Sequence, residues 1–349
     1  MDERKSRIAA VCLGLLFTLT VFTPAARATA VTRAAAEAPA VRRLVPVGHT
    51  VGVKLFADGV LVVGLSDGET PAKESGLREG DIVLRFNGTP IDSTEHLQRL
   101  LSENGEAKAT MSVQRGAKTL TLPVTPAEAE DGGYHLGAWI RDSMAGIGTM
   151  TFYDPDSGIF GALGHGVTDV DTGCLMPLQS GSIMDATVKA VKRGESGSPG
   201  ELRGDFDLTR DSGSLYANTD CGLFGTLEGA SNAITTRDAV PLARRDEVKP
   251  GKASILANCD GGEVKEYDVE IERIYAGSAP TRNLLVRVTD EALLAQTGGI
   301  VQGMSGSPIL QNGKLVGAVT HVLVNDAARG YGIFIENMLD AAGLKLAAG

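Results

Sequence analysis

The chain has 349 residues, of which 43% are hydrophobic and 22% charged, an ordinary composition for a globular protein of two or three domains. Its formal net charge of -10 excludes a nucleic-acid-binding protein, because phosphate binding needs clustered Lys and Arg and no basic patch is visible. The 44 glycines are spread along the chain, which indicates many turns between short strands.

The N-terminal segment carries a targeting signal. Basic residues among the first seven precede an apolar run from Ile8 to Phe22, and Ala26-Arg27-Ala28 follows. A basic head, an apolar run of about 15 residues and an A-x-A site are typical of a secretory signal. A membrane-spanning helix usually needs about 20 apolar residues, which favours a cleaved signal, whereas an arginine inside the cleavage site is unusual. Residues 1–28 are therefore predicted to be a signal peptide or a membrane anchor, and the remainder is expected outside the cytoplasm.

Residues 29–41 are rich in Ala and Pro, which predicts a linker, and a compact domain is expected over residues 42–126. In this domain the helix Thr94–Asn104 places three leucines on one face, at the spacing of a core-facing stripe. The expected strands are Val51–Phe56, Val60–Leu65, Ile82–Phe86, Met111–Arg115 and Lys118–Pro123.

The segment Pro71–Ile91 reads PAKESGLREGDIVLRFNGTPI and resembles the hallmark of bacterial PDZ domains. The resemblance covers about 80 residues and implies a groove that receives an extended peptide as an added strand. A loop beside that groove holds the terminal carboxylate of the peptide through backbone amides, and it falls near Val51, Gly52 and Val53. The alternative is a module that binds no peptide and only spaces or orients the catalytic part.

From residue 127 to residue 349 short apolar runs alternate with glycine-rich turns, which predicts an all-β barrel or sandwich. The fold class is therefore mainly β, with an α+β PDZ domain followed by a β-rich domain. Cys174, Cys221 and Cys259 are expected to be free or buried, because no C-x-x-C spacing indicates zinc. No metal and no cofactor is predicted.

The segment Gln302–Ile309 reads QGMSGSPI and carries the strongest chemical signal. A serine hydroxyl is a poor nucleophile that needs a base and donors for the developing oxyanion. Flanking glycines expose the hydroxyl of Ser305 and let the backbone amides of Gly303 and Ser305 point at one spot as an oxyanion hole. The segment resembles the nucleophile loop of the trypsin-like superfamily, which implies a double β-barrel. The alternative is a glycine-rich turn whose serine has no catalytic role.

The base must be one of five histidines. His165 follows an apolar strand and stands between two glycines, so its ring is expected to face a cleft. It precedes Ser305 by 140 residues, a separation that suits two small barrels. His321 is the main rival, although a core or surface role is favoured for it. The other three are expected on the surface of the PDZ region; they are His49, His96 and His135.

The orienting acid is harder to choose. It should accept the Nδ1–H of the histidine and hold its tautomer. Trypsin-like enzymes usually place this acid nearer to the histidine in sequence than to the serine, so spacing does not single out one aspartate. The candidates left open by the residues alone are Asp169, Asp171, Asp260 and Asp290.

Several longer segments together resemble the stage IV sporulation protein B family of serine peptidases. They are Ile140–Pro155, Gly161–Thr172, Leu223–Leu227 and Thr297–Asp326. Carried over position by position, the family's catalytic residues fall on His165, Asp290 and Ser305. Gly166 departs from the family pattern, where a larger apolar residue is expected, and could loosen the turn after the histidine.

This resemblance implies an exported, self-processing serine endopeptidase made in the forespore of endospore-forming bacteria. It implies a place between the forespore and mother-cell membranes and cleavage of a membrane-bound regulator there. The cleavage frees an intramembrane metalloprotease that matures the late sigma factor, sigma-K. The PDZ domain is implied to bind that target and to take part in self-recognition. The alternative is a catalytically inactive PDZ scaffold or adaptor in the cell envelope.

Overall fold

The computed structural model describes residues 40–41, 43–130, 132–207, 209–228, 237–275, 277 and 280–347. The predicted signal segment and nearly all of the predicted linker lie outside these residues. None of the helices in the described part is long and apolar enough to cross a bilayer.

The described chain is mainly β, as predicted, and it contains a PDZ module and two six-stranded rings of strands. Its helices are α1 (Pro71–Glu74), α2 (Thr94–Asn104), α3 (Glu291–Thr297) and α4 (Ile335–Ala342). Short peripheral strands are β1 (Ala40–Val41), β5 (Thr89–Pro90), β8 (Ala127–Glu128), β9 (Tyr134–His135), β16 (Val240–Pro241) and β23 (Lys345–Leu346).

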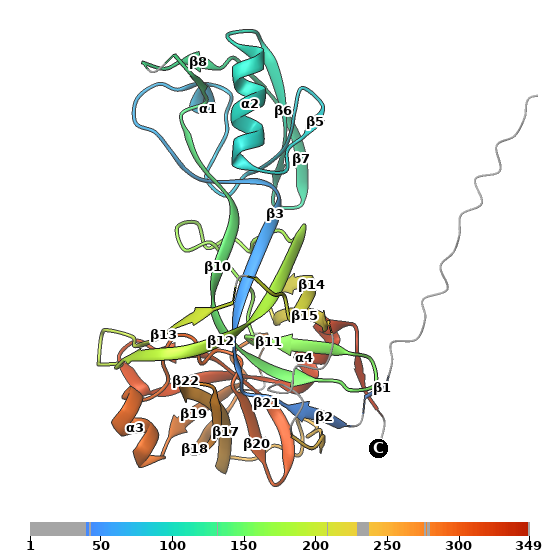
Figure 1. The fold of residues 1–349 in the computed structure, drawn as a ribbon, viewed down its shortest axis with the longest axis vertical. Coiled ribbons are helices and arrows are strands. Elements are labelled where there is room, and N and C mark those ends of the chain that lie inside the picture. The colour runs from blue at the N-terminus through green and yellow to red at the C-terminus, as the bar shows by residue number, and fades with distance from the viewer. Residues whose placement is uncertain are drawn as a thin grey trace, which may run out of the picture. The chain divides into compact units, whose positions relative to one another are not determined.

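The C-terminal strands close a barrel in the order β17-β18-β19-β22-β21-β20, coloured brown to red in Figure 1. Its strands are β17 (Gly251–Asp260), β18 (Glu263–Ile274), β19 (Leu284–Val288), β20 (Pro308–Gln311), β21 (Lys314–Leu323) and β22 (Asp326–Phe334). Inward-facing aliphatic residues such as Ile255, Val286 and Ile309 are fully buried in it. β18 and β19 alternate buried with less buried residues, whereas β17 and β21 carry continuous buried runs.

A second ring of strands precedes the C-terminal barrel in the sequence. Its strands are β3 (Thr50–Leu65), β10 (Ala138–Tyr153), β11 (Ile159–Ala162), β12 (Ser180–Lys192), β14 (Gly213–Thr219) and β15 (Gly222–Leu227). They pair in the order β3-β12-β14-β15-β11-β10, and the pairing of β10 with β3 closes the ring. β2 (Arg43–Pro46) adds to β10, and β13 (Glu201–Phe206) adds to β12. The predicted double barrel is therefore confirmed.

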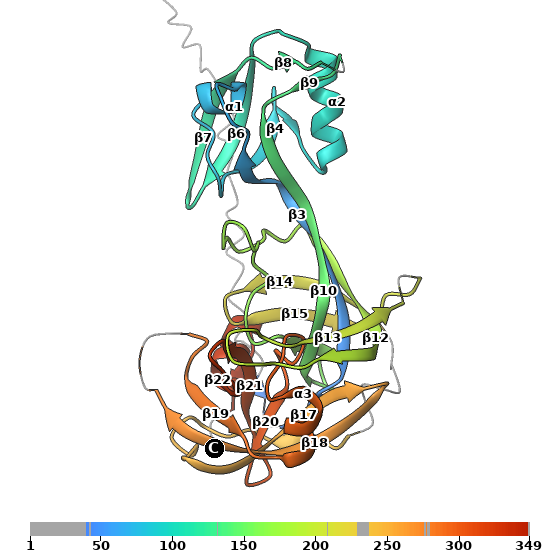
Figure 2. The ribbon, with the colours of Figure 1, turned by 90° about the vertical axis from the view of Figure 1, so that its left-hand side faces the viewer.

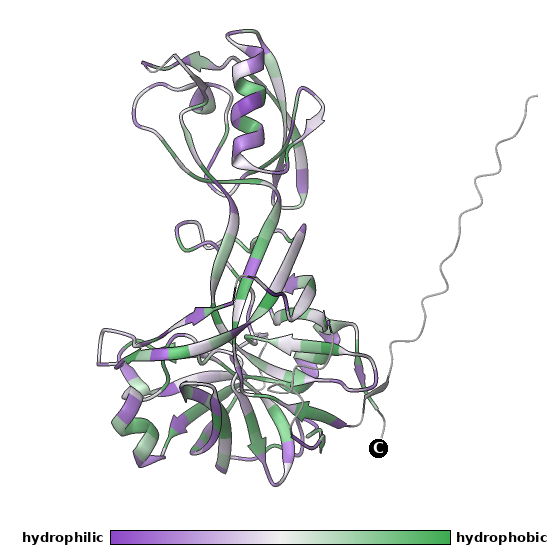
Figure 3. Cartoon of the chain, in the orientation of Figure 1, coloured by the Kyte–Doolittle hydropathy of each residue, from purple (hydrophilic) through white to green (hydrophobic). Residues whose placement is uncertain are grey.

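The PDZ module is inserted into the first ring between β3 and β10. Its strands β4 (Ile82–Phe86), β6 (Ala109–Arg115) and β7 (Lys118–Val124) continue the sheet from the far half of β3, as Figure 2 shows. Helix α2 has the predicted bounds and packs Leu97 and Leu101 into the module's core, and the banding of α2 in Figure 3 shows its two faces.

The predicted domain boundary at residue 42 differs from the observed packing. Val45, Val51 and Leu55 belong to the core of the first ring together with Phe160 and Ile183, whereas the PDZ core begins at Val60. One strand therefore serves two domains. Asp58-Gly59 divides the two strands expected from sequence, Val51–Phe56 and Val60–Leu65, but nothing in this break reveals that the two halves belong to different domains.

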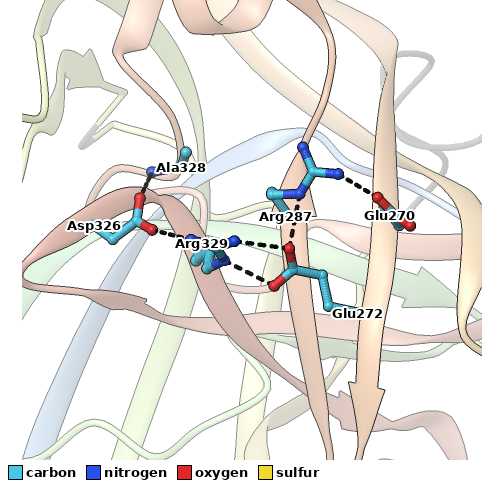
Figure 4. A network of polar contacts seen from close by, with 6 residues as sticks. All are labelled: Glu270, Glu272, Arg287, Asp326, Ala328 and Arg329. Atoms are coloured by element: carbon cyan, nitrogen blue, oxygen red, sulfur yellow. Dashed lines mark hydrogen bonds and ion pairs between the residues drawn. The ribbon is translucent and has the colours of Figure 1, made fainter.

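An ion-pair network on three neighbouring strands supports the C-terminal barrel. The carboxylate of Glu272 on β18 accepts from Arg287 at 2.8 Å and from two nitrogens of Arg329 at 2.8 and 2.9 Å, and Figure 4 shows it between the two arginines. Each arginine has a second acid, Glu270 for Arg287 and Asp326 for Arg329. A shared network of this kind holds its side chains better than isolated surface pairs do.

All three cysteines within the described residues are free, as expected. Cys259 is buried, and burial raises the pKa of its thiol to about 12, so it is not a thiolate at neutral pH.

Candidate active site

A cavity of about 550 Å³ brings together residues from both barrels. His165 and Ser305 both line it, as the sequence predicted for a nucleophile and its base. His165 follows β11 of the first ring, and Ser305 precedes β20 of the C-terminal barrel. Side chains that are 140 residues apart in sequence therefore share one solvent-accessible space.

The ring of His165 is fixed by its own chain. Its Nδ1 lies 2.8 Å from the carbonyl oxygen of Gly166. A carbonyl can only accept, so neutral His165 carries its proton on Nδ1 and leaves Nε2 unprotonated. Burial lowers the pKa of His165 below the ordinary value of 6.5, which keeps the ring neutral at neutral pH. The ring is thus held in the tautomer that a general base needs.

Glycine is required at position 166 by its surroundings. A Cβ built there would lie 2.3 Å from a methyl carbon of Leu175 and 2.6 Å from the carbonyl oxygen of Thr219. The departure from the family pattern at Gly166 therefore does not loosen the turn, because Leu175 fills the space that a larger residue would take.

Ser305 sits on a tight loop that is pinned to the first ring. The backbone amide of Thr149 donates to the carbonyl of Ser305 at 3.0 Å, and the hydroxyl of Thr149 donates to the carbonyl of Gly303 at 2.7 Å. Gly306 has φ +99°, and a Cβ there would lie 1.9 Å from the carbonyl oxygen of Thr149. The close approach of the two barrels therefore depends on Gly306 and Thr149, and the sequence offered no signal for Thr149.

The hydroxyl of Ser305 donates to the carbonyl of Thr320 at 2.7 Å. Proton transfer to His165 therefore requires Oγ to rotate away from Thr320. Ser307, two residues later, is fully buried and its hydroxyl has no partner among the described residues. Ser305 is accordingly the serine of this loop that a substrate can reach.

The amides predicted to form the oxyanion hole belong to Gly303 and Ser305. Neither amide has an acceptor among the described residues, whereas the neighbouring amides of Met304, Gly306 and Ser307 donate to backbone carbonyls. An oxyanion hole requires free donors beside the nucleophile, so the amides of Gly303 and Ser305 are both available to bind an oxyanion.

Asp290 does not lie with His165 and Ser305. Its carboxylate caps the first turn of α3, accepting from the amide of Leu293 at 2.9 Å, and it does not line the cavity. Helix α3 leads into the loop that carries Ser305, which places Asp290 15 residues before the serine without bringing it near the histidine's Nδ1.

The other three candidate acids are also outside the cavity lining. Asp169 is fully buried and forms an ion pair with Arg141, and the carboxylate of Asp171 lies 3.1 Å from the same guanidinium. Asp260 is exposed at the end of β17. The described structure therefore offers the Gly166 carbonyl, and no carboxylate, as the acceptor for Nδ1–H of His165.

His321 lines the cavity beside His165, a position that the core or surface role favoured from sequence did not anticipate. Its ring centroid is 4.8 Å from that of His165, with the planes tilted by 34°. Burial, with the nearby His165 and Arg282, lowers the pKa of His321 to about 4. His321 lies near the end of β21. This strand pairs antiparallel with β20, which follows the serine loop, and the pairing brings His321 back to the site. His49, expected on the surface, is likewise buried.

The predicted carboxylate-binding loop of the PDZ module is not a loop. Val51, Gly52 and Val53 lie near the start of β3, paired with β10 on one side and with β12 on the other. Both valines are buried in the core of the first ring. These three residues have no free amides for a peptide terminus, and the prediction of their role is therefore wrong.

Within the PDZ module, the segment from Tyr134 to Asp142 contacts both β3 and α2. Ala138 to Arg141 of β10 pair with Leu61 to Leu65 of β3. Asp142 accepts from the Thr94 amide at the start of α2 at 2.8 Å, and Gln98 of α2 donates to the carbonyl of Tyr134 at 2.8 Å. An added strand thus already lies along β3 in the described structure, and it comes from this chain.

Comparison with known families decides the class of the protein. Residues 132–339 match the family described as SpoIVB peptidase S55, and residues 63–115 match a PDZ domain. The chain belongs to the SpoIVB peptidase S55 family. The first match contains His165, Asp290 and Ser305, and the resemblance inferred from sequence is confirmed.

Curated relatives match over shorter stretches. The putative serine protease HhoA of Synechocystis is 39% identical over 72 residues, which are 20% of this chain and 18% of HhoA. The regulator of sigma-W protease RasP of Bacillus subtilis is 31% identical over 98 residues, which are 28% of this chain and 21% of RasP. The chain thus spans about a fifth of the length of these relatives.

Among solved structures, the active form of the Rv3671c protease from Mycobacterium tuberculosis is similar at 18% identity and a TM-score of 0.33. The match covers 59% of this chain and 78% of that one. The PDZ domain of the SdrC-like protein from Listeria monocytogenes has 19% identity and a TM-score of 0.22, with 24% and 87% covered.

Proposed function

We propose that this member of the S55 peptidase family is a serine endopeptidase in which Ser305 is the nucleophile and His165 the general base. The observation that carries the proposal is the shared cavity, into which a serine on a tight glycine loop and a neutral, Nδ1-protonated histidine both open. Peptides or proteins are the substrate class that this chemistry serves.

The mechanism is acyl transfer. The hydroxyl of Ser305 leaves the Thr320 carbonyl, gives its proton to Nε2 of His165 and attacks the scissile carbonyl carbon. The amides of Gly303 and Ser305 donate to the oxyanion of the tetrahedral intermediate. His165 then gives its proton to the leaving amine, and water, activated by the same ring, hydrolyses the acyl-enzyme. Throughout, the Gly166 carbonyl holds Nδ1–H and so keeps Nε2 directed at the reaction.

The biological setting follows from family membership and is part of the proposal. The enzyme is exported into the space between forespore and mother-cell membranes, processes itself near its N-terminus and cleaves a membrane-bound regulator. That cleavage releases an intramembrane metalloprotease and starts sigma-K maturation. The PDZ half of β3 pairs with Ala138 to Arg141 of β10, and the same strand goes on to carry the cavity residues Met144 to Ile147.

Self-processing is tested by exporting wild type, Ser305→Ala and Ser307→Ala from the same host and determining N-terminal sequence and intact mass. Ser307→Ala is the matched control, because it removes a hydroxyl without a partner from the same loop. Trimming between residues 29 and 45 in wild type and Ser307→Ala, but not in Ser305→Ala, is expected. Identical trimming of all three would assign that cut to a host protease and remove the support for self-processing.

A further inference from the structure

The cavity around Ser305 has an unusual composition for a site in a chain with 43 acidic and 33 basic residues. Among the described residues that line it, His165 and His321 are the only ones with an acidic or basic side chain. Both are neutral at neutral pH, because burial lowers the pKa of each. The wall of the cavity therefore carries no formal charge where a substrate side chain would enter.

Aliphatic side chains form the part of the wall nearest the catalytic serine in sequence. Ile300 and Val301 are buried in the loop that leads to Ser305, and Val322 and Val324 follow His321 at the end of β21. These residues line the cavity from the loop that carries Ser305 and from the segment that follows His321.

Two valines at this cavity remain in solvent. The side chain of Val324 is 53% exposed, and Val170, on the loop after His165, is 83% exposed. An exposed aliphatic residue alone means little, but two of them lining one concave site supply apolar area that a bound chain can cover. Burying an apolar substrate group against this area makes the free energy of substrate binding more favourable.

A charged substrate side chain would meet the opposite balance. It would lose hydration on entry and find no counter-charge in the cavity wall, which disfavours its binding. Arg282 lowers the pKa of His321 but does not line the cavity. It disfavours basic groups further and leaves acidic groups without a direct partner.

We propose that the peptidase selects substrates with an uncharged aliphatic side chain next to the scissile bond, received by the aliphatic wall that Val170, Val322 and Val324 present to the cavity. This specificity rests on the proposed peptidase function of Ser305. It defines the substrate class as extended segments rich in Val, Ile, Leu or Met, with Lys, Arg, Asp and Glu excluded from the position beside the cut.

The test profiles the full exported chain against an equimolar peptide mixture containing every residue type, with products identified by mass spectrometry and Ser305→Ala as the background control. Aliphatic residues next to the cut are expected at least about tenfold more often than charged ones, a ratio that corresponds to about 1.4 kcal/mol. Cuts dominated by Lys, Arg, Asp or Glu, or cuts without preference, would overturn the specificity.

A second measurement separates this proposal from the peptidase proposal. Diphenyl phosphonates carrying a valine, lysine or glutamate side chain react with an activated serine without needing peptide hydrolysis. If the valine probe labels Ser305 faster than the charged probes but no peptide is cleaved, the specificity proposal holds and the endopeptidase proposal is refuted. Equal or slower labelling by the valine probe would refute the specificity, whatever the enzyme cleaves.

One substitution places a charge in the cavity wall. Val324→Asp is expected to raise labelling by the lysine probe about fivefold relative to the valine probe, as one partly solvated ion pair would. The matched control is Asn325→Asp, which puts the same charge on the next residue, exposed and outside the lining. The same shift in both variants would show a general charge effect and contradict the assignment of Val324 to the specificity wall.

Discussion

The carboxylate of Asp290 accepts a hydrogen bond from the backbone amide of Leu293 at 2.9 Å, which makes it the N-cap of α3. An aspartate with this duty stabilises the helix that leads into the nucleophile loop. It differs from the aspartate of a catalytic triad, which accepts from the histidine ring.

The two roles of Asp290 predict different outcomes for the same substitutions. Asn and Ser cap helices about as well as Asp, so Asp290→Asn and Asp290→Ser should keep kcat/KM within a few-fold of wild type. Asp290→Ala should lose about 1 kcal/mol of stability through the missing cap. Peptide hydrolysis and chemical denaturation measure both quantities. A loss of about 10⁴-fold in kcat with Asp290→Asn would instead assign Asp290 to the triad.

The paired histidines predict an asymmetric response to ring-preserving substitutions. His165→Phe removes the general base and should lower kcat by at least about 10²-fold. His321→Phe keeps a ring against His165 and should lower kcat by less than about tenfold. Steady-state kinetics on the two folded variants compare them directly. Equal losses would mean that the nitrogens of His321 take part in the proton transfer.

The clamp between Thr149 and the nucleophile loop can be tested by isosteric substitution. Thr149→Val removes the hydrogen bond to the Gly303 carbonyl and should cost about 1–2 kcal/mol of stability and lower kcat. Thr151→Val is the matched control on the same strand, because that buried hydroxyl has no partner among the described residues, and it should be neutral or stabilising. Urea unfolding and kcat give the readout. Similar effects of both changes would refute the clamp.

The pH profile reports the protonation of His165. Its pKa is lowered by burial, so the neutral base persists as pH falls below 6.5. The acid limb of kcat/KM should therefore have an apparent pKa below 6.5, and activity should change little between pH 8 and that value. Peptide hydrolysis at constant ionic strength measures the profile. An apparent pKa at or above 6.5 for the acid limb would show that the charged imidazolium of His165 is stabilised, as a neighbouring carboxylate would do.

Local patterns in the sequence predicted the parts of the fold whose signals are local. The α2 stripe of Leu97 and Leu101 and the glycine loop around Ser305 both have short-range signatures, and each was found where expected. The histidine could be chosen because a strand followed by Gly-His-Gly is a local pattern as well.

The features that depend on tertiary pairing could not be predicted. Val51, Gly52 and Val53 were assigned to a PDZ loop through the family resemblance, yet the register of β3 with β10 and β12 places them in the peptidase core. His321 and Thr149 reach the site only through the closure of two barrels. The acceptor for Nδ1–H of His165 is the backbone carbonyl of Gly166. Every residue type has such a carbonyl, so the sequence cannot identify it as the acceptor.

The central claim is that Ser305 is a nucleophile activated by His165, and site-mapped labelling with a fluorophosphonate probe tests it most directly. Wild type, His165→Ala and Ser305→Ala are treated as full exported chains whose folding is checked by circular dichroism. The account predicts a single adduct on Ser305 in wild type, at least about 10²-fold slower labelling in His165→Ala, and none in Ser305→Ala. A folded wild type that does not react, or that reacts at the same rate without His165, would contradict it.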